Sequence, residues 1–118
     1  MQTDQPHLDH ENLDVYRCAI DFLRVAFAIV AALPRGESEL RSQLKRAAMS
    51  MPLNIAEGAG KPGAVDRARY HGIARGAAME CAAIIDVCRV AEMTSEEDGR
   101  KAKALLVRIV SMLTKMCR

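Results

Sequence analysis

Residues 43–61 read QLKRAAMSMPLNIAEGAGK, and this stretch determines where the chain turns back on itself. Apolar residues in its first half recur every three or four positions, as on one face of an α-helix, at Leu44, Ala47, Ala48 and Met51. Pro52 has no backbone N–H and its ring clashes with the preceding turn, so we expect the helix to kink or restart near Ser50. Closely spaced glycines and a proline over residues 58–63 then predict a loop.

The same apolar spacing predicts three more helices, over residues 15–33, 66–91 and 97–116. Pro34 ends the first of them, and Ser38 is the expected N-cap of the kinked helix. Asp66 is the expected N-cap of the next helix. Thr94, followed three residues later by Glu97, has the spacing of a capping box before the last helix.

These patterns predict an all-α fold, an antiparallel up-down-up-down four-helix bundle over residues 13–118, because short connections favour antiparallel neighbours. Residues 1–12 are polar and acidic, so we expect a flexible N-terminal arm. The N-terminus lacks the features of a signal peptide, and the longest apolar run, residues 25–33, is about half of the ~20 residues needed to cross a bilayer. We therefore expect a cytoplasmic protein that does not bind membranes.

The helix predicted over residues 66–91 contains a charged residue among apolar ones. Glu80 falls on its expected core face. That face consists of Tyr70, Ile73, Ala77, Ile84, Val87 and Ala91. A buried carboxylate must be paired or protonated. We therefore expect Glu80 to pair with a polar group of the preceding helix, at Arg46, Ser50 or Asn54.

Gly72 and Gly76 lie four residues apart within the same predicted helix. A glycine inside a helix costs about 1 kcal/mol relative to alanine, so we expect a reason for both. We favour close approach of a neighbouring helix backbone over this face, with a bound ligand as the alternative. The nearly all-apolar residues 81–91 also indicate a helix that is covered on two sides.

The sequence shows no catalytic, metal-binding or cofactor motif. His71 has no carboxylate three or four residues before it, unlike the Glu-x-x-His ligands of metal sites in bundles. The four cysteines have no C-x-x-C pair and are interpreted as small buried apolar residues. We expect a protein that is not an enzyme and holds no cofactor. An enzyme would need Glu57, Arg75 and Glu80 to meet in a solvent-reachable pocket.

Basic residues form two groups on the predicted helices. One edge of the last helix, opposite its core face, carries Lys101, Arg108, Lys115 and Arg118. The helix before the glycine loop carries Arg41, Lys45 and Arg46. The net charge of +2 does not by itself indicate nucleic acid. Repeated around an oligomer, both groups could bind the phosphates of RNA or DNA, and a solvated surface is the alternative.

Residues 43–61 resemble the signature of the bacterial four-helix-bundle family named after intervening sequences in 23S ribosomal RNA genes. The similarity extends upstream through LDVYRCAIDFLRV at residues 13–25, and downstream through Tyr70, residues 73–76 and Glu80. It implies an antiparallel four-helix bundle that assembles into a homopentameric ring, with no assigned enzymatic activity and a link to RNA that rests mostly on gene location. A distant relative, the accessory variability protein of diversity-generating retroelements, is a pentameric bundle that holds nucleic acid on basic surface and partners a reverse transcriptase.

The residues that match the family motif are Arg46, Asn54, Glu57, Gly58, Arg75, Gly76 and Glu80. We interpret them as fixing the kinked helix against the next one. Leu53 and Ala77 depart from the family pattern, in which serine is usual at both positions. Two functions stay open: a homo-oligomer that binds RNA or DNA through its basic edges, or a protein adaptor without nucleic-acid binding. In the first, copies associate through spare apolar surface of the third helix, flanked by Val107 and Val110. In the second, the same apolar surface or the concavity of a ring contacts another polypeptide.

Overall fold

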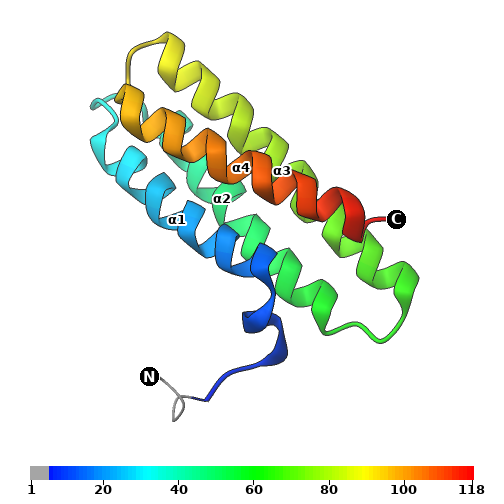
Figure 1. The fold of residues 1–118 in the computed structure, drawn as a ribbon. Helices are drawn as coiled ribbons and strands as arrows, with labels where there is room; N and C mark the ends of the chain where they lie inside the picture. The colour runs from blue at the N-terminus through cyan, green and yellow to red at the C-terminus, as the bar shows by residue number, and fades with distance from the viewer. Residues whose placement is uncertain (1–5) are drawn as a thin grey trace.

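The computed structural model describes residues 6–118, which contain helices and no strand (Figure 1). The elements are the 3-10 turn η1 (Asp9–Asn12) and the helices α1 (Asp14–Ala32), α2 (Ser38–Ala59), α3 (Ala64–Val90) and α4 (Glu96–Met116). The predicted all-α architecture with four helices is confirmed. Residues 1–5 of the predicted arm lie outside the described residues.

The helices pack in the order in which they occur in the chain. α1 contacts α2, α2 contacts α3, α3 contacts α4, and α1 also packs against α4. Each helix runs antiparallel to the one before it (Figure 1). Because each helix contacts only the two beside it, the α1–α2 pair and the α3–α4 pair form opposite sides of the bundle. The start of α1 and the finish of α4 lie at the same end, where Leu13, Asp14, Lys115 and Met116 border one shallow pocket.

The core lies between the four helices and consists mostly of aliphatic side chains. The largest residues that are fully buried are Phe22, Ile29, Leu44, Met51, Ile55, Ile85, Leu106, Ile109 and Leu113. α3 differs because it turns mainly small residues inward: Ala74, Ala78, Cys81 and Cys88. Small side chains let helices approach closely, and α2 and α3 make the most extensive contact in the bundle. All four cysteines are free and, as predicted, Cys18, Cys81 and Cys88 are buried, whereas Cys117 is half-buried.

α2 continues through Pro52 as one helix from Ser38 to Ala59. The predicted restart near Ser50 is therefore wrong, and the predicted kink at Pro52 is not confirmed. A proline removes one hydrogen bond of the helix. Met51 and Ile55, both fully buried, anchor α2 in the core on either side of Pro52, and this packing favours a continuous helix over a break.

The N-caps of three helices differ from the predicted ones. Glu37 precedes α2 and Gly63 precedes α3, neither with a side-chain capping bond. Ser95 caps α4, because its Oγ accepts a hydrogen bond from the backbone N–H of Asp98 at 3.0 Å. The predictions that are wrong concern Ser38, Asp66 and Thr94. The short loops start α2 and α3 slightly earlier than expected, so the first two of these lie inside the first turn.

The core face of α3 is rotated relative to the prediction. Ile73 and Val87 are 44% and 53% exposed, and Glu80 is also exposed rather than buried and paired. Ala77 and Ile84 of the predicted face are buried, together with Ile85, and the rest of the observed core face consists of small residues and His71. The error has a physical cause: large aliphatic residues dominate a hydrophobicity pattern, whereas the close contact with α2 requires small ones.

Candidate interaction surfaces

α4 carries an exposed basic edge along its length. The edge consists of Lys101, Arg108, Lys115 and Arg118. Within residues 6–118 none of the four forms an ion pair, whereas Nζ of Lys103 on the same helix lies 2.6 Å from Oδ1 of Asp86. Acidic residues border both ends of the edge, Glu97 beside Lys101 and Asp14 beside Lys115. Because its four cations are exposed and unpaired among the described residues, the edge is accessible to a polyanion.

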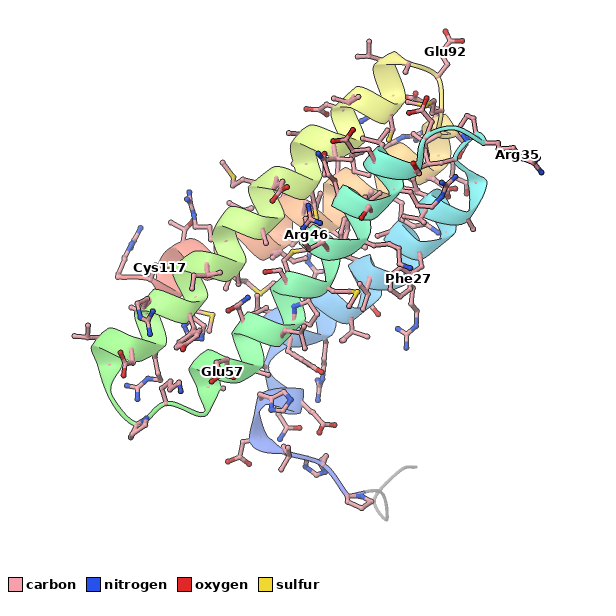
Figure 2. The ribbon with its side chains drawn as sticks, turned by 180° about the vertical axis from the view of Figure 1, so that it is seen from behind. Phe27, Arg35, Arg46, Glu57, Glu92 and Cys117 are labelled. Carbon is pink, nitrogen blue, oxygen red and sulfur yellow. The ribbon has the colours of Figure 1, made fainter. Side chains whose placement is uncertain are left out.

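Of the three basic residues of α2, one has a structural role and two are exposed. The guanidinium of Arg41 donates to the carbonyls of Val30, Leu33 and Pro34 at 3.4, 3.2 and 3.2 Å. It thereby satisfies carbonyls at the C-terminal end of α1, which have no partner within that helix. Lys45 and Arg46 are exposed, and Figure 2 shows Arg46 on the outer side of α2. Of the three, only these two are free to meet phosphate.

Two residues of the family motif make local contacts at the end of α2. The amide of Asn54 donates to the carbonyl and to Oγ of Ser50, at 2.9 and 3.0 Å. The carboxylate of Glu57 pairs with Nζ of Lys61 at 3.1 Å, just beyond the helix. These contacts stay within about one turn, and they hold the end of α2 and the loop that follows it.

Two other motif residues join different helices. Gly58 packs against α3, because a Cβ at this position would lie 2.9 Å from Nε2 of His71. Nε of Arg75 on α3 donates to Oγ1 of Thr114 on α4 at 2.8 Å, and this hydroxyl donates to the carbonyl of Val110 at 2.7 Å. Gly58 thus connects α2 with α3, and Arg75 connects α3 with α4.

His71 is a buried polar residue that the sequence did not identify as part of the core. Neither ring nitrogen has a hydrogen-bond partner among the described residues. Burial lowers the pKa of His71, and the nearby Arg67 guanidinium acts in the same direction. The backbone carbonyl of Met116 favours the charged ring but is not in hydrogen-bonding geometry. We infer that the His71 ring is neutral and fills space between α2 and α3. The absence of a side chain at Gly58 leaves room for this ring.

The residues that an enzyme would need do not converge. Glu57 pairs with Lys61 in the α2–α3 loop, Arg75 bonds to Thr114 on α4, and Glu80 is exposed. Residues 6–118 contain no group of three His, Cys, Asp or Glu placed to hold a metal ion. Across the same residues, no helix combines the length and hydropathy that a membrane span requires.

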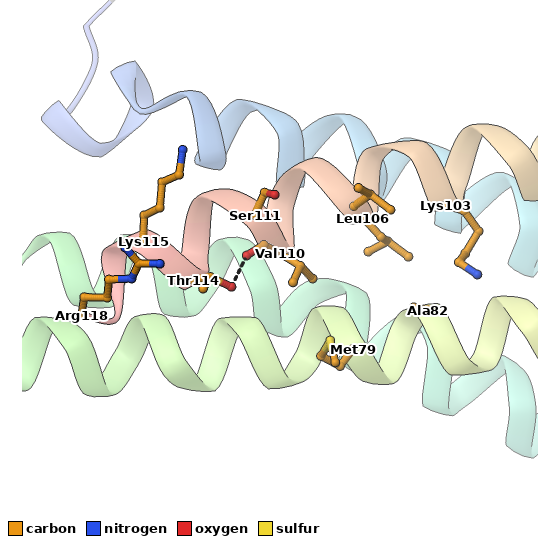
Figure 3. A pocket seen from close by; sticks show the side chains of 10 residues that line it. Met79, Ala82, Lys103, Leu106, Val110, Ser111, Thr114, Lys115 and Arg118 are labelled. Atoms are coloured by element: carbon orange, nitrogen blue, oxygen red, sulfur yellow. Dashed lines mark hydrogen bonds between the residues drawn. The ribbon is translucent and has the colours of Figure 1, made fainter.

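An apolar groove of about 470 Å³ runs between α3 and α4 (Figure 3). We call it the α3/α4 groove; its lining includes Met79, Leu106, Val107 and Val110. Lys103 stands toward one end, and Lys115 and Arg118 stand at the other (Figure 3). Val107 is 64% exposed, in agreement with the predicted apolar flank of α4.

A second apolar groove, of about 450 Å³, lies on the opposite side of the bundle between α1 and α2. This α1/α2 groove is lined by His10, Tyr16, Ile20, Leu23, Phe27, Met49, Pro52, Leu53 and Ala56. Leu53 is 63% exposed, so the position where the family resemblance leads us to expect serine adds apolar surface here. The sequence analysis did not predict this groove, although the outward spacing of Tyr16, Leu23 and Phe27 was the available signal.

The outer side of α3 is open. No atom of another part of the chain lies within 4 Å of a Cβ built at Gly72 or Gly76. Among residues 6–118 no neighbouring helix approaches this face, so the predicted close approach within the bundle is wrong. Exposed apolar residues continue along the outer side of α3, and we call the set that includes the two glycines the α3 surface: Gly72, Ile73, Gly76, Met79, Val87 and Val90.

Comparison with known proteins shows which family this bundle belongs to. The sequence profile of the family described as 23S rRNA-intervening sequence protein matches residues 11–115. The chain belongs to this family. The match confirms the resemblance of residues 43–61, and it includes the basic residues of α2 and most of those on α4. No curated protein matches the sequence significantly.

A solved structure also resembles this member of the 23S rRNA-intervening sequence protein family. It is the crystal structure of a protein of unknown function from the S23 ribosomal protein family of Bacteroides thetaiotaomicron, with a TM-score of 0.80. The two chains are 18% identical, and the alignment covers 88% of this chain and 98% of the other. At this identity the similarity concerns the fold alone.

Proposed function

We propose that the protein assembles with copies of itself into a closed ring, which presents the basic edge of α4 to RNA or DNA. The observation that carries the assembly is the open α3 surface. Each glycine inside a helix costs about 1 kcal/mol relative to alanine, and nothing in the described part of the chain, residues 6–118, occupies the space at Gly72 or Gly76. The backbone of a second copy can approach closely there, over exposed apolar neighbours.

Two different apolar surfaces on one protomer favour a ring over a two-fold dimer. The α3 surface and the α3/α4 groove lie on one side, and the α1/α2 groove lies on the other. Contact between unlike surfaces is heterologous, and it forms a ring when the rotation closes. An isologous dimer would leave one of the two surfaces uncovered. A pentamer is the size that the family resemblance implies.

Glycine substitutions test the assembly. We expect wild-type protein to have several times the chain mass of 12.9 kDa by light scattering coupled to size exclusion. The double variant Gly72→Ala, Gly76→Ala should be monomeric. Its monomer should also unfold at a higher urea concentration, because replacing two helix-interior glycines raises the free energy of unfolding by up to about 2 kcal/mol. Gly63→Ala is the control, because its Cβ would also meet nothing within 4 Å but it lies outside the α3 surface. Unchanged mass of the double variant would reject contact over these glycines.

The exposed cations support nucleic-acid binding. Lys101 and Arg108 have no ion-pair partner within residues 6–118, and a ring repeats them once per copy. The logarithm of the binding constant falls linearly with the logarithm of the salt concentration, and each phosphate contact adds to this slope. Loss of one contact reduces the magnitude of the slope by about 1. Fluorescence anisotropy with labelled single-stranded RNA and duplex DNA, over a series of salt concentrations, measures this slope.

The variant Lys101→Gln with Arg108→Gln should bind more weakly and with a smaller salt slope. Lys61→Gln is the control, because Glu57 already engages that cation. Equal affinity of the double variant and wild type would reject the α4 edge as the binding surface. Absence of binding at low salt would reject nucleic acid but leave the ring intact.

A protein adaptor is the second candidate. The two grooves, of about 470 and 450 Å³, are large enough to hold side chains of another polypeptide. A monomeric wild-type protein that binds neither RNA nor DNA, and that co-purifies with one defined protein, would favour this function over the first.

A further inference from the structure

The N-terminal turn η1 is well held although none of its residues is buried. The carboxylate of Glu11 accepts a hydrogen bond from the backbone N–H of Leu8 at 2.9 Å, and its carbonyl accepts one from Nε of Arg17 at 3.1 Å. Leu8 is 65% exposed, and the carboxylates of Asp9 and Glu11 lie next to it in sequence. This turn is suited to an apolar site with a cationic border.

η1 belongs to the α1–α2 side of the bundle. It contacts both helices, and the ring of His10 packs edge-on against that of Tyr16, with centroids 4.7 Å apart. Both of these residues line the α1/α2 groove. The chain before α1 points away from the bundle at the end where α1 begins (Figure 1).

The α3/α4 groove has the complementary character on the opposite side. Its lining includes Leu106 and Val110, and Lys115 and Arg118 stand where α4 finishes (Figure 3). These two cations have no ion-pair partner in the described part of the chain. The finish of α4 and the start of α1 share one end of the bundle, so η1 and the cationic end of the groove lie at the same level.

From these positions we infer that η1 of one copy docks in the α3/α4 groove of the next, an inference that rests on the proposed ring. Leu8 covers the apolar lining, and Asp9, with Glu11 beside it, faces Lys115 and Arg118. A rotation axis parallel to the bundles keeps the same ends of all copies level, so the acidic turn of one copy meets the cationic end of its neighbour. The opposite charges guide the approach and fix the register.

This docking divides the cations of α4 between two tasks. Lys115 and Arg118 hold the neighbouring copy, whereas Lys101 and Arg108 stay available to phosphate. Each copy contributes one turn and receives one, so every cationic end in a closed ring is occupied.

Charge reversal in the intact chain tests the docking. Asp9→Lys should weaken the association between copies about tenfold at low salt, and so should Lys115→Glu combined with Arg118→Glu. A chain with all three reversals should regain most of the association, because each reversed turn then meets a reversed groove. Glu39→Lys, an exposed residue in the first turn of α2 at the opposite end of the bundle, is the control and should leave the mass unchanged.

Light scattering over a dilution series, at low and high salt, separates this docking from the ring itself. Weakened variants, recovery in the triple variant and a smaller effect at high salt are the expected results. If wild type and the Asp9→Lys variant assemble equally well, the docking is rejected and the ring is retained. A wild type that is monomeric at every concentration would reject both. Weakened variants without recovery in the triple variant would also reject the docking, because the charges would then act elsewhere.

Discussion

Replacement of Gly58 by alanine probes the packing between α2 and α3. A Cβ at Gly58 would lie 2.9 Å from Nε2 and 3.0 Å from Cδ2 of His71, and 3.2 Å from Cβ of Tyr70. Neither neighbour moves easily, because the His71 ring is buried and Cβ of Tyr70 is fixed to the α3 backbone. Overpacking costs about 1–3 kcal/mol, and the better helix propensity of alanine recovers at most about 1 kcal/mol. We therefore expect the free energy of unfolding to fall, by up to about 2 kcal/mol.

Urea unfolding followed by circular dichroism, at one fixed protein concentration, measures this loss. Thermal unfolding should show a Tm lower by about 4–8 °C. Gly60→Ala, at the end of the same helix, is the matched control, because its backbone is right-handed and its Cβ would meet only ordinary contacts at 3.6 Å or more. In a His71→Ala background the same substitution should cost less, since the obstructing ring is gone. An equal cost with and without the ring, or no loss at all, would refute the packing argument.

Three further predictions concern the same framework. Burial holds the pKa of His71 in the folded protein below its unfolded value. The contribution of the neutral ring to stability is therefore complete above about pH 6.5 and is lost as the pH falls below that value. Between pH 7.5 and 5, the urea midpoint should fall more for wild type than for His71→Leu. Arg75→Leu removes the 2.8 Å hydrogen bond to Thr114 and should lower the free energy of unfolding by about 1 kcal/mol, whereas an unchanged urea midpoint would mean that this contact does not stabilise α3 against α4. Ser95→Ala should cost about 1 kcal/mol in the same assay and Thr94→Ala much less, with the reverse order indicating that Thr94 is the cap after all.

Helix positions and the core faces of α1, α2 and α4 follow from the sequence alone. Pro34 and the glycines over residues 58–63 interrupt the chain where the structure has loops, because these residues disfavour helix. α1 and α4 bury the residues that their apolar spacing predicts, such as Phe22 and Leu113, since large side chains alternate clearly with polar ones. The basic edge of α4 is exposed for the same reason, because it lies opposite such a face. The family motif adds to these patterns the expectation of a ring, which is still a prediction.

Only the tertiary structure decides features that depend on contacts between helices. α3 buries Ile84 and Ile85 but otherwise turns alanine, cysteine and His71 inward and leaves Ile73 outside, because close packing against α2 favours small side chains. Pro52 stays within a continuous helix, because buried neighbours on both sides stabilise it more than local propensity disfavours it. The open space at Gly72, like the two grooves on opposite sides of the bundle, depends on the placement of all four helices. Periodicity along one helix carries no information about what lies across from it, and these surfaces therefore emerge only when the chain is folded.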